Sequence, residues 1–465
     1  MPRFEVELTL LFVMAITRSY CDHVDWTLRD TTLAPPITLG SNVTNLTLSN
    51  VTIVGDGSFT VDVSQMVDYA QRSPQAADTS LAILVVVEHC LILGNVQVQF
   101  RSIVEITPLL NGKSINITIV FRNNIIRNST VYFPFLDKLS SSLVYESSAT
   151  TASGISQNAS SLVIEGNHFI NDNVAINPSM TLPTISSGMG IGVSNIIGVL
   201  IGKIDNWGLL TIRNNTFNML CVDESVDFAI VFWTDAFRVE GKHAEVIVEN
   251  NEFDLEEVAA IRVLGDCYLR NFGTLQLTTN TIRSRSSHGF TGGKFVISLQ
   301  SISTTVLGGG LLVISHNDIH HEFTASQPMT SRTFYTGVVF HRVVVHDAHS
   351  SFRIDNNNVN MSTPGATATR GMYFDHFDVD GNGRVTVDRN SITAVGESGI
   401  AGILAAYERV GTEQSKVQSG GLISFSENHI TVISLQHGHD VPGWCWNRND
   451  VLLQCHYPSG PERYT

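Results

Sequence analysis

The sequence has few of the residues that build a scaffold from disulfides, metals or charges. Cysteine occurs six times in 465 residues and never as a Cys-x-x-Cys pair, which argues against a disulfide-built scaffold and a thiolate zinc site. Charged residues make up only 15% of the chain, as expected where buried strands dominate. The chain also lacks Gly-x-Ser-x-Gly elbows, phosphate-binding loops and Arg-Gly-Asp triplets. These absences leave no recognisable motif for acyl transfer, nucleotide binding or integrin recognition.

Long apolar runs are also missing. No stretch after the N-terminus reaches the ~18 apolar residues of a membrane-spanning helix. The nine-residue run Leu8 to Ile16 resembles the apolar part of a signal peptide, with a buried first strand as the alternative interpretation. We therefore expect a signal peptide over residues 1–20 and a secreted or cell-surface protein, with no transmembrane segment apart from that run.

The balance of charge limits the partners. The net charge is −15, from 28 Lys and Arg against 43 Asp and Glu. A surface of that sign repels phosphate backbones, so nucleic acid and anionic membranes are poor partners.

What the sequence does contain is one short pattern repeated nine times between residues 121 and 430. Each copy has an apolar residue, two mostly polar residues, an Asn, one variable residue and a second apolar residue, as in Val248 to Phe253. Successive Asn residues are 29 to 48 positions apart and 38 on average, which is the mark of a repeat protein. The nine are Asn124, Asn167, Asn215, Asn251, Asn280, Asn317, Asn357, Asn390 and Asn428.

The local chemistry favours strands over helices in each repeat. Copies mix Phe, Ile, Val and Leu, unlike leucine-rich repeats, and strand-like runs such as Phe228 to Thr234 lie between them, while the 3.6-residue spacing of amphipathic helices is missing. We predict an all-β fold, a right-handed single-stranded parallel β-helix of the pectin-lyase-like type. The Asn residues should adopt the left-handed conformation of a sharp turn and bond to one another as a ladder.

The repeats define the expected organisation. A β-helix should occupy residues 21–440, with Trp26 to Asp62 as its first coil or cap. Ser- and Thr-rich residues 138–161 and Gly-rich residues 173–206 read as long loops, and insertions in a solenoid gather on one face, often the binding face. Residues 441–465 contain Cys and Trp and match no repeat, which predicts a C-terminal cap or the start of a further module.

One segment carries a candidate cation site. Asp378, Asp380 and Asn382, followed by Gly383, match the early ligand spacing of a calcium loop, but Arg389 stands where the bidentate Glu belongs. The alternative is a polar turn between strands. No other cofactor is indicated.

Other polar clusters have similarly open interpretations. Histidines gather in one region, and acids in two, where stacked coils could form a metal site or the paired carboxylates of a polysaccharide lyase or hydrolase. Solvated side chains on an acidic protein explain the same clusters. The histidines are His316, His320, His321, His341, His346, His349 and His376, and the acids are Asp223, Glu224, Asp227, Asp235, Asp254 and Glu257.

Two covalent modifications are candidates. Cys445 and Cys455 are the most suitable disulfide pair, although connectivity does not follow from sequence. Eight Asn-x-Ser/Thr triplets are glycosylation candidates, at Asn42, Asn45, Asn50, Asn116, Asn128, Asn158, Asn214 and Asn360.

Several short segments together carry a family resemblance. They are Thr32-Leu-Ala-Pro-Pro36, Leu46-Thr-Leu-Ser-Asn-Val-Thr-Ile-Val54, Phe59-Thr-Val-Asp-Val-Ser64, Cys90-Leu-Ile-Leu-Gly94, Val120-Phe-Arg-Asn-Asn124, Glu165-Gly-Asn-His-Phe-Ile-Asn-Asp172 and Leu209-Leu-Thr-Ile-Arg213. In this combination the chain resembles dispersed gene family protein 1, a surface-protein family of trypanosomes. The resemblance implies a pectin-lyase-like β-helix in a cell-surface or secreted glycoprotein with an adhesive role and no established enzymatic activity. The chain is similar to an N-terminal piece or shortened copy of such a protein.

Three functions remain open. The first is an adhesin-like glycoprotein that binds a host matrix protein or glycan through loops on the β-helix. The second is a polysaccharide lyase or hydrolase of the pectin-lyase-like type, and the third is a truncated family copy without function.

Overall fold

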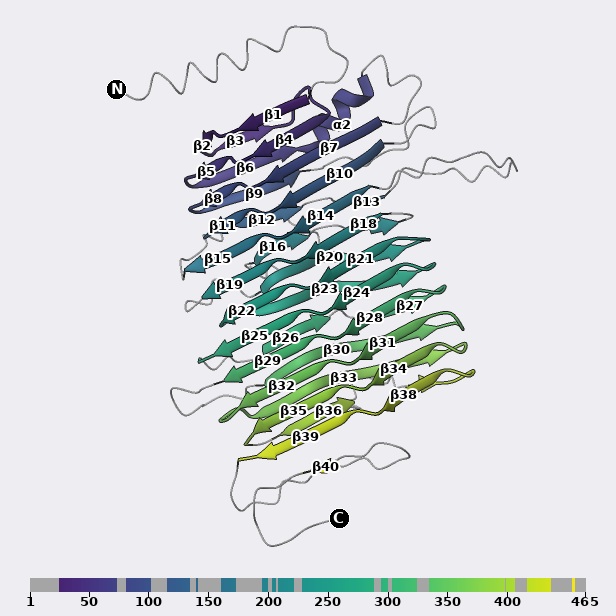
Figure 1. Ribbon diagram of the computed structural model, residues 1–465. Helices are drawn as coiled ribbons and strands as arrows, with labels where there is room; N and C mark the ends of the chain where they lie inside the picture. Colours follow the sequence, from purple (N-terminus) through teal and green to yellow (C-terminus); the bar gives the residue numbers. More distant parts are fainter. Residues whose placement is uncertain are drawn as a thin grey trace, which may run out of the picture.

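The computed structural model describes residues 25–72, 81–101, 115–133, 139–140, 160–172, 195–199, 203–205, 208–220, 228–287, 294–299, 303–323, 334–397, 399–405, 416–435 and 454–455. These residues form a right-handed parallel β-helix, as predicted. Its three sheets run the length of the molecule, and each coil contributes one strand to each sheet in turn (Figure 1). The structure thus resolves the strand-like run between Asn copies as the third strand of each coil.

Sheet A and sheet B meet at the Asn turns. Sheet A comprises β1 (Asp25–Arg29), β4 (Asn45–Ser49), β7 (Leu81–Glu88), β10 (Ile115–Arg122), β14 (Ser161–Glu165), β18 (Leu209–Arg213), β21 (Glu245–Glu249), β24 (Thr274–Thr278), β28 (Leu311–Ser315), β31 (Ser351–Asp355), β34 (Arg384–Asp388) and β38 (Leu422–Ser426). Sheet B comprises β2 (Thr32–Leu33), β5 (Thr52–Val54), β8 (Leu91–Leu93), β11 (Ile125–Arg127), β15 (His168–Asp172), β19 (Thr216–Leu220), β22 (Glu252–Glu256), β25 (Thr281–Ser286), β29 (Asp318–Phe323), β32 (Asn358–Thr363), β35 (Ser391–Gly396), β39 (His429–Ser434) and β40 (Gln454–Cys455).

Sheet C closes the coil and has the longest strands. Its main path is β3 (Ile37–Leu39), β6 (Gly57–Asp62), β9 (Val96–Arg101), β12 (Thr130–Phe133), β16 (Asn195–Val199), β20 (Phe228–Glu240), β23 (Ala259–Arg270), β26 (Lys294–Leu299), β30 (Phe334–His346), β33 (Ala368–Asp380) and β36 (Ile400–Ala405). The short strands β13 (Leu139–Ser140), β17 (Lys203–Asp205), β27 (Thr304–Leu307) and β37 (Lys416–Val417) widen it on one side.

Two sequence-based expectations differ from the structure here. The segment 173–206, expected to be a loop, contains the sheet C strands β16 and β17. Amphipathic helices were expected to be missing, yet α2 (Val63–Arg72) follows the second coil. Its N-terminus is capped by Asp62, whose carboxylate accepts a hydrogen bond from the Gln65 N–H at 3.1 Å and another from the Gln65 side chain at 3.0 Å. The helix buries one face, formed by Val63, Met66, Val67 and Ala70.

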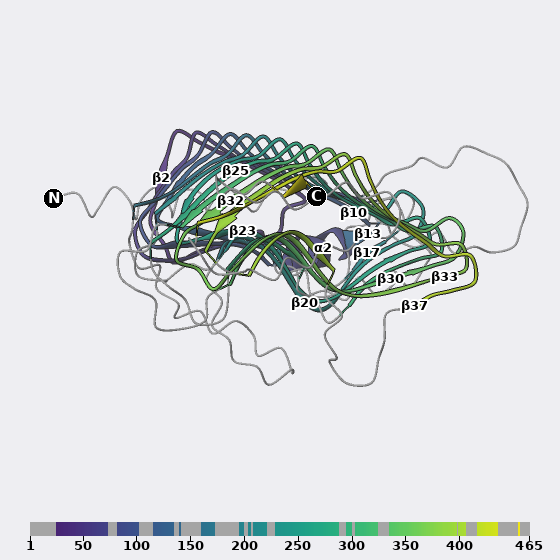
Figure 2. The same ribbon diagram turned by 90° about the horizontal axis from the view of Figure 1, so that it is seen from below.

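The Asn ladder is present at all nine predicted positions. In each step the backbone N–H and the Nδ2–H of one Asn both donate to Oδ1 of the next, at 2.9 to 3.1 Å. The Nδ2 group also donates to a sheet A carbonyl, for example Asn251 to Ile212 O at 3.0 Å. At the N-terminal end the N–H of Cys90 donates to Asn124 Oδ1 at 2.9 Å, so the ladder stops at a buried thiol. Since each buried amide is fully bonded, the ladder stabilises the A–B corner that stacks along the axis in Figure 2.

The proposed backbone role of these Asn residues was wrong. The left-handed conformation belongs to the residue immediately before each ladder Asn, where φ lies between 51° and 64°. The chain turns at that residue, so that the following Asn is free to aim its amide along the axis. Asn, Gly and even Thr279, Arg389 and Glu427 occupy this preceding position.

The interior is filled by side chains that repeat at the same height in successive coils. Phe169, Phe217 and Phe253 stack with ring centroids 4.9 and 4.6 Å apart and interplanar angles of 5°. All three are fully buried. Parallel strands in register therefore align like side chains into continuous columns.

Candidate functional site

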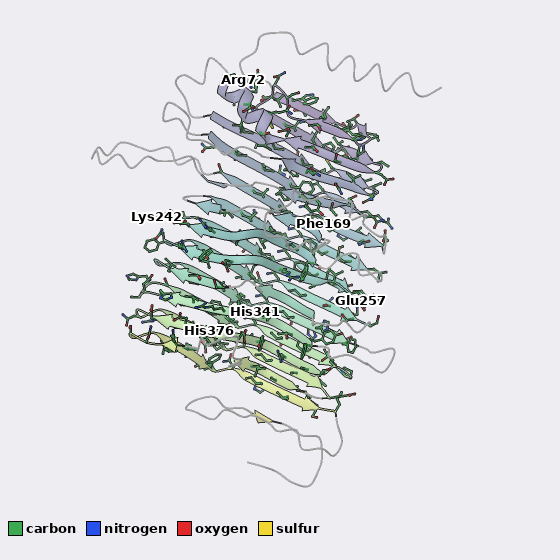
Figure 3. All side chains as sticks on the ribbon, turned by 180° about the vertical axis from the view of Figure 1, so that it is seen from behind. Arg72, Phe169, Lys242, Glu257, His341 and His376 are labelled. Carbon is green, nitrogen blue, oxygen red and sulfur yellow. The ribbon has the colours of Figure 1, made fainter. Side chains whose placement is uncertain are left out.

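The outer face of sheet C carries two groups of aromatic and charged side chains. The strands β20, β23, β30 and β33 are the longest of this sheet, and the register between β20 and β23 shifts between Trp233 and Ala236. His341 and His376 mark this face in Figure 3, between Lys242 at one edge and Glu257 at the other. Buried residues alternate with partly exposed ones along β33 beyond the bend, so every second side chain faces outward.

The first group, here the Tyr268 cluster, comprises Arg238, Asp266, Tyr268, Arg270 and Ser303. Arg238 pairs with Tyr268 in the register of β20 and β23, and its guanidinium carbon lies 5.8 Å from the ring centroid. The guanidinium carbon of Arg270 lies 4.4 Å from the same centroid, within cation–π distance. The Tyr268 hydroxyl donates to Asp266 Oδ2 at 3.1 Å, and the Ser303 N–H donates to Asp266 Oδ1 at 3.0 Å. The tyrosine ring is therefore fixed at its hydroxyl and holds two cations beside it.

The environment of Tyr268 keeps its hydroxyl protonated. Partial burial raises the pKa of Tyr268, and the hydrogen bond to Asp266 and the charge of that carboxylate raise it further. The two arginines act in the opposite direction, but burial and Asp266 outweigh them. The hydroxyl consequently remains a donor to Asp266 throughout the physiological pH range.

The second group, here the Tyr373 cluster, comprises Phe334, His341, Arg370, Tyr373 and Asp375. The Arg370 guanidinium carbon lies 4.5 Å from the Tyr373 ring centroid and 5.5 Å from that of Phe334. The Tyr373 hydroxyl donates to Asp375 Oδ1 at 3.3 Å, and His341 Nδ1 lies 3.5 Å from Asp375 Oδ2. A guanidinium beside a tyrosine that bonds a carboxylate thus occurs twice on this face.

Three of these cations have no carboxylate partner among the described residues. Arg238, Arg270 and Arg370 make ring contacts but no ion pair there. Glu240 lies opposite Arg270 in the register and accepts a hydrogen bond from Asn271. The Nε groups of Arg270 and Arg370 are buried without a hydrogen-bond partner. A guanidinium group beside an aromatic ring can still donate hydrogen bonds from its terminal Nη groups to an oxyanion.

The structure does not gather the candidate calcium ligands around a common point. Asp378 and Asp380 lie in β33, and basic side chains of β30 already accompany them: Arg342 Nη2 lies 3.8 Å from Asp378 Oδ2, and His346 hydrogen-bonds Asp380. Asn382 lies beyond the strand, in a turn closed by the Gly383 N–H and Asp380 O at 2.8 Å. This arrangement is a polar turn with ion pairs across neighbouring coils.

The histidines are distributed over different faces. His320 is on sheet B with Asp318, His341, His346 and His376 are on sheet C, and His321 points inward, where it contacts Ser284 Oγ at 3.1 Å. His316 and His349 lie in turns on opposite sides of sheet A. Within the described ranges no group of three or more His, Cys, Asp or Glu side chains is placed to hold a metal ion.

The candidate catalytic acids that fall within the described residues do not lie close together. Asp254 faces outward on sheet B, bonded to Arg285 at 2.8 Å, whereas Glu257 is buried at the B–C corner, where it accepts from Ser287. Asp223, Glu224 and Asp227, and the side chain of Asp235, lie outside the described residues. The described part of the chain therefore supplies no carboxylate pair from this set.

The candidate modification sites fall in different environments. Asn42, Asn50 and Asn214 are exposed turn residues, Asn45, Asn128 and Asn360 are partly exposed, and Asn116 is buried. Asn158 and Cys445 lie outside the described residues, as do residues 1–20 and most of 138–161 and 441–465. Cys90 and Cys267 are buried free thiols. In the portion of the chain that is described, no helix is both long and apolar enough to cross a membrane.

Comparisons with known proteins give no family assignment. The chain matches no protein-family model, and no curated protein or solved structure is significantly similar to it.

No sequence motif marks the two clusters. Their only local mark is alternation, as in Phe237-Arg-Val-Glu240 and Cys267-Tyr-Leu-Arg270, where polar residues alternate with buried ones. That pattern predicts which side chains face outward. It does not predict which coils bring them together.

Proposed function

We propose that this protein is an adhesin-like extracellular protein that binds an acidic glycan along the outer face of sheet C. The observation that carries the proposal is the set of guanidinium groups, Arg238, Arg270 and Arg370, held against tyrosine rings without carboxylate partners among the described residues. Carboxylate and sulfate groups are the planar or multidentate oxyanions that a fixed guanidinium binds best.

The physical setting favours a polymer over a small ligand. Neighbouring strands of a parallel sheet lie about 4.8 Å apart, so outward side chains recur at fixed intervals along the axis. Arg238 and Arg270 come from successive coils. Arg370 lies further along the sheet and nine residues before Val379, the residue level with Leu269, so a polymer that reaches both clusters crosses the sheet obliquely. A linear chain with an acidic group on some of its sugars can contact such a face at several points, and these contacts reinforce one another.

The charge of the whole molecule makes the contact selective. With a net charge of −15, most of the surface repels a polyanion. A partner of that sign can bind only where cations are concentrated and preorganised, and the ring contacts lower the entropy lost on binding. The expected consequence is moderate affinity that decreases with salt.

The exposed glycosylation candidates are compatible with this surface. Asn50 and Asn214 lie at the A–B corner, opposite sheet C, because each is the left-handed turn residue between a sheet A strand and the following sheet B strand. Sugars attached there would leave sheet C accessible. Secretion or display at the cell surface, expected from the apolar N-terminal run and the family resemblance, belongs to the same proposal.

A binding panel tests it. Immobilised polygalacturonate, a sulfated glycosaminoglycan and neutral dextran are compared by biolayer interferometry with the full chain. We expect binding to one or both acidic polymers, none to dextran, and a loss of at least ~10-fold in affinity when Arg238 and Arg270 are both changed to Ala, about 1.4 kcal/mol.

The control is Arg283→Ala, which removes an exposed arginine from sheet B. It should leave binding unchanged. Equal losses in both variants, or binding that does not depend on the acid groups of the polymer, would overturn the proposal. Arg270→Lys separates charge from geometry, because Lys keeps the charge but lacks the planar edge, and it should weaken binding nearly as much as Ala.

A further inference from the structure

The outer face of sheet A carries a stripe of mainly apolar residues that no described element covers. Seven strands from β7 to β28 place one outward residue each at the same height, and these residues pair in register from strand to strand. All are partly exposed except Thr211, which is buried. The stripe consists of Val86, Val120, Val163, Thr211, Ile247, Gln276 and Val313.

A row of charges runs beside the stripe, two residues further along each strand. Its signs alternate from coil to coil: Glu88, Arg122, Glu165, Arg213 and Glu249. Arg122 contacts Glu88 at 2.6 Å and Arg213 contacts Glu165 at 3.1 Å. Neighbouring charges in the row therefore pair within one molecule, and their signs alternate regularly along the axis.

We propose that sheet A is the contact face of a symmetric dimer, with a second copy of this chain as its occupant. The alternating charges favour a second copy as the partner, because an inverted copy presents the opposite charge at each position of the row. A two-fold axis parallel to the strands and between β14 and β18 reverses the order of the coils in the second copy. Glu165 then faces Arg213 of the second copy, and Arg122 faces its Glu249.

The same axis superposes the stripe on itself. Val120 meets Ile247 of the second copy, which is an aliphatic pair, and Val163 and Val86 meet Thr211 and Gln276. Such an interface is isologous, because each contact occurs twice with the partners exchanged. An axis placed on a strand instead of between two strands would set like charges opposite each other, so the charge row favours an axis between strands.

The area is sufficient for a weak dimer. The axis between β14 and β18 pairs the six strands from β7 to β24. Six strands at ~4.8 Å by five residues at ~3.3 Å give a footprint of about 29 by 17 Å, or roughly 500 Å² on each copy. The total of about 1,000 Å² is at the lower limit for a specific interface. The sheets of a β-helix stack with little twist, so two such faces can stay about 10 Å apart along their whole length. We expect a dimer with a micromolar dissociation constant.

Sedimentation velocity on the full chain tests the proposal over about 1 to 100 μM. The sedimentation coefficient should rise with concentration toward that of a dimer. Val163→Lys should keep the protein monomeric over this range, whereas Ile170→Lys should not change dimerisation. Ile170 is the matched control, because it is a partly exposed apolar residue on sheet B of the same coil. Circular dichroism confirms that both variants are folded.

A charge exchange fixes the register. Arg122→Glu should weaken the dimer at least ~10-fold, and adding Glu249→Arg to it should restore most of the affinity. A protein that is monomeric at every concentration, a dimer that survives Val163→Lys, or equal effects of both lysine variants would overturn the proposal. Failure of the double variant to restore association would overturn the proposed axis.

Discussion

The Asn ladder predicts that the substitution Asn251→Leu lowers the free energy of unfolding strongly, because it leaves buried hydrogen-bonding groups without partners. The Asn251 side chain makes four hydrogen bonds: its Oδ1 accepts from the N–H and Nδ2 of Asn215, and its Nδ2 donates to Ile212 O and Asn280 Oδ1, all at 3.0 Å. The residue is 1% exposed, so water cannot replace these partners. Leu has a similar volume but leaves two donors of Asn215 and the Ile212 carbonyl without partners.

The magnitude follows from the groups left unpaired. A buried polar group that loses its partner costs about 1 to 3 kcal/mol, so three such groups cost about 3 to 6 kcal/mol after the apolar gain of Leu is included. Because coils contact only their neighbours, the damage should be local. Hydrogen exchange followed by mass spectrometry should show lost protection in residues 209–217 and 274–282, with a smaller effect elsewhere.

Two companion variants make the test specific. Asn218→Leu, on the exposed outer face of β19, should change the free energy of unfolding by less than about 0.5 kcal/mol. In Asn251→Asp one carboxylate oxygen would face two acceptors, which raises the pKa of the new acid above its unfolded value near ~3.9. The folded state then binds the proton more tightly, so the variant should be closest to wild type at low pH and lose stability as pH rises. A small effect of Asn251→Leu, or a penalty in Asn251→Asp that does not change with pH, would refute the reasoning.

Three further predictions concern the core and the turns. Phe217→Ala removes the middle ring of the Phe169–Phe253 stack and should cost about 3 to 5 kcal/mol in chemical denaturation, with Phe217→Leu costing less than half as much. Thr279→Asn should raise the free energy of unfolding by about 0.5 to 1 kcal/mol, because Thr279 holds φ 54° and Asn tolerates that conformation; no gain would contradict the assignment of strain. Burial raises the pKa of Cys267 to about 12, so this thiol destabilises the folded state only above the unfolded thiol pKa near 9. At pH 8 the folded thiol is therefore less often a thiolate than the unfolded one. Peptide mapping should find Cys267 labelled about 1,000-fold more slowly in native protein than in urea.

The ladder could be predicted from the sequence because its chemistry is local. An amide between two apolar residues, repeated at each coil, marks both the turn and the columns of core residues that flank it. All nine positions were found in this way, and the three-sheet solenoid follows from stacking them. The helix α2 was missed, although the pair Asp62 and Gln65 and the spacing of Val63, Met66, Val67 and Ala70 are a readable signal.

The clusters on sheet C could not be predicted because they depend on registers between coils. Arg238 and Tyr268 are neighbours only because the strands β20 and β23 pair across an irregularity between Trp233 and Ala236. Coil lengths that vary from 29 to 48 residues hide that register from any fixed period. The left-handed turn residue was misplaced by one position for a related reason, since Asn is common at both the turn and the ladder, as in Asn250 and Asn251.

The most direct test of the proposed function compares one acidic polysaccharide with the same polymer after its carboxyl groups have been reduced to alcohols. The chain length and sugar rings stay the same, and only the partner of the guanidinium groups is removed. We expect binding of the acidic form to fall at least ~10-fold on reduction and to weaken with rising salt, with a shallower salt dependence when Arg238 and Arg270 are changed to Ala. Equal affinity for both polymers, or a salt dependence that the two substitutions leave unchanged, would contradict recognition by the arginines of sheet C.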